Sequence, residues 1–240
     1  MQTLKTKLAV TVAAGVLAAC PVANAALTVG ASVGGLPDTA GATLVNFENL
    51  TLGNSSQTVI PGVMSVNFSP DGQVVHQGAS GQIAEPYLSS GQGAVFGTPD
   101  GPDKTKYLTS GAVPSTADAT LTFTSPQNYL GLLWGSVDNY NTLTLLRGNT
   151  VVGTVLGSQV LTAAGINTSG AQDAAGTAYV NIHSTMGFNK VVATSSSYAF
   201  EFDNVAFSAV PEPSTYIAGA LLLLPFGFSV LRSARRKQVS

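Results

Sequence analysis

Cysteine and charged residues are the scarcest features of this 240-residue chain. Cys20 is the one cysteine, so no disulfide can form within the chain, and stability must come from a hydrophobic core, with or without a metal ion. Charged residues make up 9% of the sequence, and the Lys-Glu surface of amphipathic helices is almost absent. This composition argues against a helical protein and favours short strands and turns.

Basic residues are especially rare in the middle of the chain. Between Ala26 and Val210, four Lys and Arg residues stand against eleven Asp and Glu residues, a net charge of −7. A nucleic-acid-binding surface needs clustered Lys and Arg to neutralise phosphates. The middle region therefore predicts no nucleic-acid partner.

Signatures of catalysis are also weak. The two histidines, His76 and His183, have no motif neighbours, and the chain has neither a His-Glu-x-x-His zinc motif nor a Gly-Lys-Ser/Thr phosphate loop. We therefore predict that the protein is not an enzyme. A secreted hydrolase is the alternative, and it requires one histidine to lie beside a nucleophile or an acid.

The first 25 residues have the order of a secretory signal peptide. Lys5 and Lys7 precede an apolar run over 8–19, and the small residues of Ala23-Asn24-Ala25 follow. This predicts export through the Sec machinery and cleavage by signal peptidase between Ala25 and Ala26. The segment ending in Cys20 also resembles the lipobox of bacterial lipoproteins, so a lipidated Cys20 is the alternative.

The last 31 residues, 210–240, have three parts. The triplet Pro211-Glu212-Pro213 comes first, an apolar run over 216–231 predicts a transmembrane helix, and a basic cluster ends at Lys237. Sixteen residues at about 1.5 Å each give a helix of about 24 Å, which is short for a hydrocarbon core of about 30 Å. The basic end stays cytoplasmic by the positive-inside rule and leaves the remaining chain outside. A helix this short suggests that the segment holds the protein in the membrane only temporarily. A permanent single-pass anchor is the alternative.

Residues 26–209 predict one domain of many short strands, an antiparallel β-sandwich of the jelly-roll-like kind. Alternating apolar residues and turn signals place the strands, and Gly148-Asn149 predicts a two-residue hairpin turn. The Gly- and Pro-rich region 78–114 predicts a long loop and a binding rim. The expected strands cover 43–52, 63–68, 73–77, 120–125, 129–134, 142–147, 150–156, 178–183, 190–195 and 198–208, and 162–176 is expected to be a loop or a short helix.

Two groups of residues are candidates for binding. Glu48 and Asp203 are acids in otherwise uncharged β sequence, and hard oxygen ligands suit Ca²⁺. They resemble the early Phe-Glu and late Asp-Asn-Val strands that a structural calcium bridges in carbohydrate-binding jelly-roll modules; the alternative is that Asp203 only caps or turns its strand. Trp134, Asp138 and Tyr140 offer an aromatic face and polar groups for a glycan, whereas a core position is the alternative for Trp134.

The three-part tail, together with the export signal, resembles the PEP-CTERM sorting signal of Gram-negative bacteria that make exopolysaccharide. The resemblance implies that an exosortase in the inner membrane recognises Pro211, Glu212 and Pro213, cleaves nearby and passes the protein to the cell surface or the extracellular matrix. The body is similar to a subset of PEP-CTERM surface proteins at 133–141 and 202–205, which supplies no substrate. We therefore expect an exported, exosortase-processed, non-catalytic protein associated with exopolysaccharide or biofilm, or alternatively a calcium-dependent carbohydrate-binding module.

Overall fold

The computed structural model describes residues 26–88, 100–111 and 118–210. The predicted signal peptide, the sorting motif and the transmembrane helix over 216–231 lie outside these residues, as does much of the predicted binding rim. Within the described part of the chain, no helix is long and apolar enough to cross a membrane.

The described chain is an all-β fold with antiparallel pairing, as its composition predicts. Its elements, in chain order, are β1 (Leu27–Ser32), β2 (Thr43–Val45), β3 (Gln57–Ile60), β4 (Met64–Ser69), β5 (Gln73–Val75), β6 (Tyr87–Leu88), β7 (Gly101–Pro102), β8 (Tyr107–Thr109), β9 (Asp118–Gly135), β10 (Asn141–Arg147), β11 (Thr150–Leu156), α1 (Gly157–Ala164), the 3-10 turn η2 (Ala174–Gly176), β12 (Ala178–Ser195) and β13 (Glu201–Ala209).

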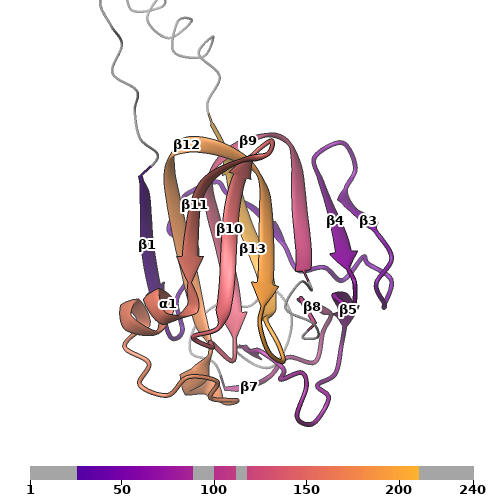
Figure 1. Cartoon of the computed structure of the whole chain (residues 1–240), viewed down its shortest axis with the longest axis vertical. Helices are drawn as coiled ribbons and strands as arrows, with labels where there is room; N and C mark the ends of the chain where they lie inside the picture. The colour runs from indigo at the N-terminus through magenta and orange to yellow at the C-terminus, as the bar shows by residue number, and fades with distance from the viewer. Residues whose placement is uncertain (1–25, 89–99, 112–117, 211–240) are drawn as a thin grey trace, which may run out of the picture.

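Two long strands, β9 and β12, pass through both halves of one continuous sheet and arch over one end of the molecule (Figure 1). Residues 129–134 of β9 pair with 178–183 of β12, in the half that also holds β1, β13, β2, β8 and β5. Residues 118–122 of β9 pair with 190–194 of β12, in the half that holds β10, β11, β4 and β3. The two halves therefore face a shared core.

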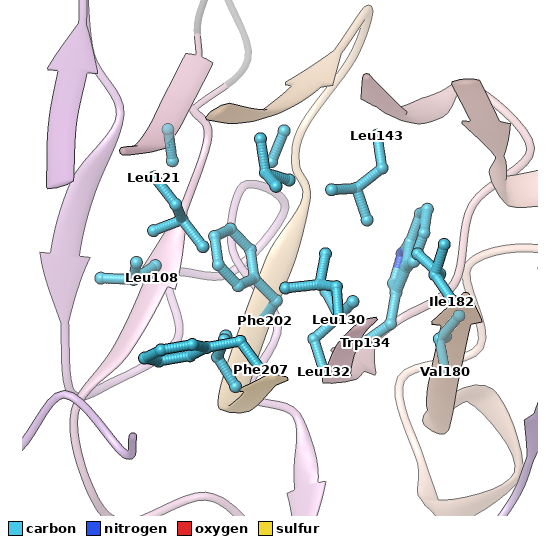
Figure 2. Packing of buried hydrophobic residues seen from close by; sticks show 14 of the residues in the cluster. Leu108, Leu121, Leu130, Leu132, Trp134, Leu143, Val180, Ile182, Phe202 and Phe207 are labelled. Atoms are coloured by element: carbon cyan, nitrogen blue, oxygen red, sulfur yellow. The ribbon is translucent and has the colours of Figure 1, made fainter. Parts of the chain in front are cut away.

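Alternation along these strands sends one set of side chains into that core. Leu130, Leu132 and Trp134 of β9 pack there with Val180 and Ile182 of β12, and each is 2% exposed or less (Figure 2). The side chains between them point to the opposite face of the sheet. That outer face is where the polar groups discussed below lie.

The sequence-based prediction was wrong about where the long strands end. It placed gaps between strands at 126–128 and 184–189. In the structure β9 and β12 run through these residues without ending, and the register of their pairing with each other shifts there. Pro126 has no N–H to donate, so it fits the part of β9 that does not pair with β12. Gly187 lies against it, because an added Cβ there would come within 2.9 Å of Pro126 Cβ.

Other boundaries also differ from prediction. The strand expected over 43–52 stops at Val45, since Phe47 adopts φ 58° and turns the chain. The helix α1 begins at Gly157, before the expected loop, and ends at Ala164, where Gly165 follows in the left-handed conformation. The hairpin turn at Gly148-Asn149 is confirmed, with Arg147 opposite Thr150.

Both ends of the described chain emerge at the arched end of the sheet. The Ala26 carbonyl accepts a hydrogen bond from the Thr185 amide at 3.1 Å, and the Val210 amide donates to the Pro126 carbonyl at 3.0 Å. The loops that follow β9 and precede β13 lie at the opposite end, about 26 Å away by the length of β13. The polar groups at that far end are therefore remote from both chain ends.

Candidate functional site

Two acidic side chains of β13 occupy the outer face of the sheet and are nevertheless buried. Glu201 and Asp203 alternate with Phe202, which points into the core, and they are 1% and 0% exposed. Segments from the long Gly- and Pro-rich region cover them. The Ala84 amide donates to Glu201 Oε1 at 2.9 Å, and Asp103 lies beside Asp203.

The first polar group is a pair of carboxyls, Asp103 and Asp203. Both oxygens of Asp203 and Oδ2 of Asp103 are buried without a hydrogen-bond partner in the structure, whereas Oδ1 of Asp103 accepts from the Thr105 amide and hydroxyl at 2.7 and 2.6 Å. Burial, followed by the neighbouring Asp103 charge, raises the pKa of Asp203 well above its usual range. Burial likewise raises the pKa of Asp103. Two buried carboxyls this close are costly to ionise together, so the pair needs a proton or a cation to neutralise it.

Glu48 adds to the negative charge around this pair. Its charge makes a small contribution to raising the pKa of both Asp103 and Asp203. Glu48 itself is exposed, and its Oε1 accepts from the Lys106 amide at 2.7 Å. Phe47 packs edge-on against Phe202, with 6.2 Å between the ring centroids, which aligns the two segments. Lys106 is the nearby base, but its Nζ donates to the Glu48 and Leu50 carbonyls at 2.9 and 2.6 Å.

No group of three or more His, Cys, Asp or Glu side chains with the arrangement of a metal site occurs among the described residues. A cation at the Asp103–Asp203 pair would therefore need backbone or amide oxygens in addition to the two carboxylates. Such mixed oxygen sets are ordinary for Ca²⁺. Asp103 was not predicted from the sequence, because it lies in a turn-rich stretch where acids usually shape the backbone.

The second polar group lines a cavity of about 250 Å³ at the end of the sheet opposite the chain ends. Asp138, Tyr140 and Glu201 contribute to its wall. The Tyr140 hydroxyl donates to the Tyr198 carbonyl at 2.7 Å, and the Ser169 hydroxyl donates to Asp138 Oδ1 at 3.3 Å. Burial raises the pKa of Asp138, and burial also raises the pKa of Glu201, to about 8.

Trp134 does not belong to this cavity. Its ring is fully buried in the core (Figure 2). It stacks on Phe200 with 4.0 Å between the ring centroids. It has no face open to a ligand, so the core alternative describes its position. Asp138 and Tyr140 line the cavity without it, and the exposed aromatic ring beside them is Tyr198, which sequence reasoning missed.

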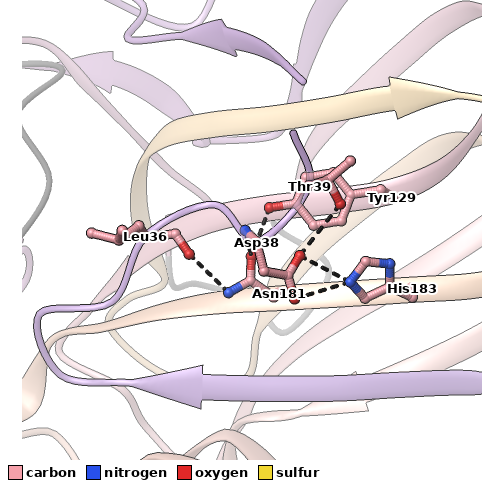
Figure 3. A network of polar contacts seen from close by, with 6 residues as sticks. All are labelled: Leu36, Asp38, Thr39, Tyr129, Asn181 and His183. Carbon is pink, nitrogen blue, oxygen red and sulfur yellow. Dashed lines mark hydrogen bonds and ion pairs between the residues drawn. The ribbon is translucent and has the colours of Figure 1, made fainter. Parts of the chain in front are cut away.

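The two histidines lie on the surface. His183 pairs with Asp38 at 2.9 Å and packs against Tyr129, within a network that ties the loop before β2 to the sheet (Figure 3). Burial raises the pKa of Tyr129 to about 12. Neither His76 nor His183 lines the cavity of Glu201. The residues 30–34 read Gly-Ala-Ser-Val-Gly and so have the Gly-x-Ser-x-Gly spacing of a hydrolase nucleophile elbow. Ser32, however, ends the edge strand β1 and precedes a turn, whereas the nucleophile of such an elbow precedes a helix.

Comparison with known proteins does not identify a family. No family model matches the chain, and no curated protein matches it. Among solved structures, it is similar to a Stig cyclase, Fisc from Fischerella sp. TAU, with 11% identity, a TM-score of 0.33 and coverage of 71% of this chain and 86% of that chain. It is also similar to the enzymatically active domain of tailspike protein 4 from bacteriophage CBA120, with 14% identity, a TM-score of 0.24 and coverage of 69% of this chain. The latter match spans 20% of the tailspike chain.

Proposed function

We propose that this chain is an exported cell-surface or extracellular-matrix protein, processed at both ends, whose domain associates with exopolysaccharide without catalysis. In this proposal the fold is a jelly-roll-like β-sandwich, delivered by the signal peptide and released from the inner membrane by an exosortase at Pro211, Glu212 and Pro213. The observation that supports it is the placement of the chain ends. Ala26 and Val210 both leave the arched end of the sheet, and the polar cavity lies at the other end.

This placement suits a domain held at one end. A precursor attached to the membrane through the segment after Val210 would present the loops around Asp138 and Tyr140 away from that membrane. The net charge of −7 between Ala26 and Val210 also suits a soluble domain outside the cell that does not bind nucleic acids.

The proposal is tested by intact-mass analysis of protein extracted from the cell surface, with and without the host exosortase. We expect a mature chain that begins at Ala26 and ends close to Pro211–Pro213, and a longer C-terminus when the exosortase is missing. A diacylated Cys20 would replace the signal-peptidase cleavage with lipoprotein processing. An intact C-terminus in the presence of the exosortase would instead establish a permanent anchor.

A second candidate, a calcium-dependent carbohydrate-binding module, is favoured by Asp203. A carboxylate that is fully buried, without a donor and next to Asp103 is costly unless a cation or a proton neutralises it. Ca²⁺ would supply two positive charges to oxygens that lack partners. Asp103 and Asp203 would hold the ion, with Glu48 at the edge of the group, and the ion's role would be structural.

A further inference from the structure

The cavity beside Glu201 has the composition of a binding site for a neutral, hydroxyl-rich molecule. Its polar lining includes Gln82, Ser136, Asp138, Tyr140, Gln172 and Glu201. Among the residues that the structure describes, no Lys, Arg or His lines it, so this lining offers no positive charge to pair with an anion. Carboxyl and amide groups exchange hydrogen bonds with hydroxyls, and the rings of Tyr140 and Tyr198 supply apolar faces at the same place.

Glu201 is the most informative of these residues. It is 1% exposed, its Oε1 accepts from the Ala84 amide, and its Oε2 has no hydrogen-bond partner. Buried polar atoms in folded proteins almost always have partners, so an unpaired carboxyl oxygen on a residue that lines a cavity needs an explanation. A ligand that bonds to Oε2 provides one.

The size of the cavity limits the ligand. Its volume of about 250 Å³ lies just below the range of about 300–1,000 Å³ that drug-sized ligands occupy. One sugar unit matches this size, and a longer chain would have to continue past the rim. The cavity therefore suits the end of a polysaccharide better than its middle.

We propose that this cavity binds one neutral terminal sugar unit of an extracellular polysaccharide, with Oε2 of Glu201 bonded to a sugar hydroxyl and Tyr198 and Tyr140 against the ring. This inference rests on the carbohydrate-binding candidate and gives it a site and a ligand class. Acidic sugars are disfavoured, because the described lining holds two acids, Asp138 and Glu201, and no Lys, Arg or His to pair with a carboxylate.

The test uses the domain 26–209, since its described elements share one core, and saturation-transfer NMR with methyl glycosides of glucose, galactose, mannose and N-acetylglucosamine. Methyl glucuronide is the acidic probe. Gln82→Trp blocks the cavity from an exposed turn, and Asn149→Trp adds the same ring to the hairpin after β10 as a control. Glu201→Gln keeps a donor and an acceptor at every pH, whereas Glu201→Ala keeps neither.

We expect at least one neutral glycoside to bind, glucuronide to fail, and Gln82→Trp and Glu201→Ala to weaken binding about tenfold or more. Asn149→Trp should bind as the wild type does. Glu201→Gln should bind more tightly than Glu201→Ala, because it keeps a donor and an acceptor at this position. Binding that persists in Gln82→Trp and Glu201→Ala would place the sugar elsewhere, overturning this site while leaving the carbohydrate-binding candidate intact. Wild-type binding to none of the glycosides would overturn both and leave the proposal of export and processing untouched.

Discussion

Asp203 combines complete burial with an acidic neighbour and no hydrogen-bond partner for either carboxylate oxygen. Side chains of this kind are normally paired with a base or with a metal ion. The nearby Lys106 is held by two backbone carbonyls instead. Asp203 is therefore neutralised either by a retained proton, in line with its raised pKa, or by a bound cation.

We predict that Ca²⁺ raises the melting temperature of the chelator-treated domain. At a concentration of 100 times Kd, a ligand stabilises the folded state by about 2.7 kcal/mol, which corresponds to roughly 5–10 °C for a domain of this size. Asp203→Asn should abolish the increase measured by calorimetry. Asp118→Asn changes another carboxyl with a raised pKa, on β9, and should leave the increase unchanged. An equal response in both variants, or none in the wild type, would contradict a calcium site at Asp203.

The sequence predicted part of this chemistry and could not predict the rest. Glu48 and Asp203 stand out because acids are rare in strands of this composition, and the structure places them near each other. Asp103 could not be chosen among several acids of a turn-rich region, because its role depends on a chain segment folding over β13. Trp134 was ambiguous, since a strand places a residue on one of two faces and only the folded sheet shows which is buried.

At the level of elements, the long strands show why boundaries are harder to predict than strands. The alternation on each side of Ser125-Pro126 was recognised, but proline is also the usual mark of a loop. Pro126 instead sits in a bend where β9 leaves its pairing with β12. β9 therefore pairs in both halves of the sheet. This arrangement depends on the core that the two halves share, and the local alternation of apolar residues in the sequence does not reveal it.

The first residue of α1 fixes the position of the loop that carries Asp138. A Cβ added at Gly157 would lie 1.8 Å from the Asp138 carbonyl oxygen, which is backbone and cannot rotate away. We predict that Gly157→Ala destabilises the domain by about 1–3 kcal/mol through overpacking, as measured by urea denaturation. It should also weaken sugar binding, because Asp138 must move.

Gly30→Ala is the matched control for that substitution. Gly30 lies in β1 with nothing within 4 Å of an added Cβ, and the change should alter stability by less than about 0.5 kcal/mol. If both variants unfold at the same urea concentration, the close approach of α1 to the Asp138 loop does not constrain the domain.

At the scale of the whole molecule, acidic residues outnumber basic ones, and several of the acids are buried. Eleven acids and four bases lie between Ala26 and Val210, and burial raises the pKa of Asp103, Asp138, Glu201 and Asp203. These four belong to the covered outer face of the sheet or to its far end, remote from where the chain ends emerge. The charge is therefore placed where the proposed ligands would bind, and the folded domain tolerates it at a cost in stability.

That cost predicts an unusual pH dependence for the metal-free domain. A carboxyl ionises near pH 4 in the unfolded chain, whereas Glu201 keeps its proton in the folded state up to about pH 8. The folded state binds more protons in this window, so the free energy of unfolding falls as pH rises from about 4 to about 8. For Glu201 alone the loss is on the order of 4 kcal/mol. Urea denaturation in a chelator at pH 5, 7 and 9 should show the wild type weakening steadily and Glu201→Gln weakening less, with the two most alike at pH 5. The loss that remains in Glu201→Gln comes from Asp103, Asp138 and Asp203, whose pKa values are also raised. Parallel curves for the two proteins would mean that Glu201 ionises in the folded domain as it does in the unfolded chain.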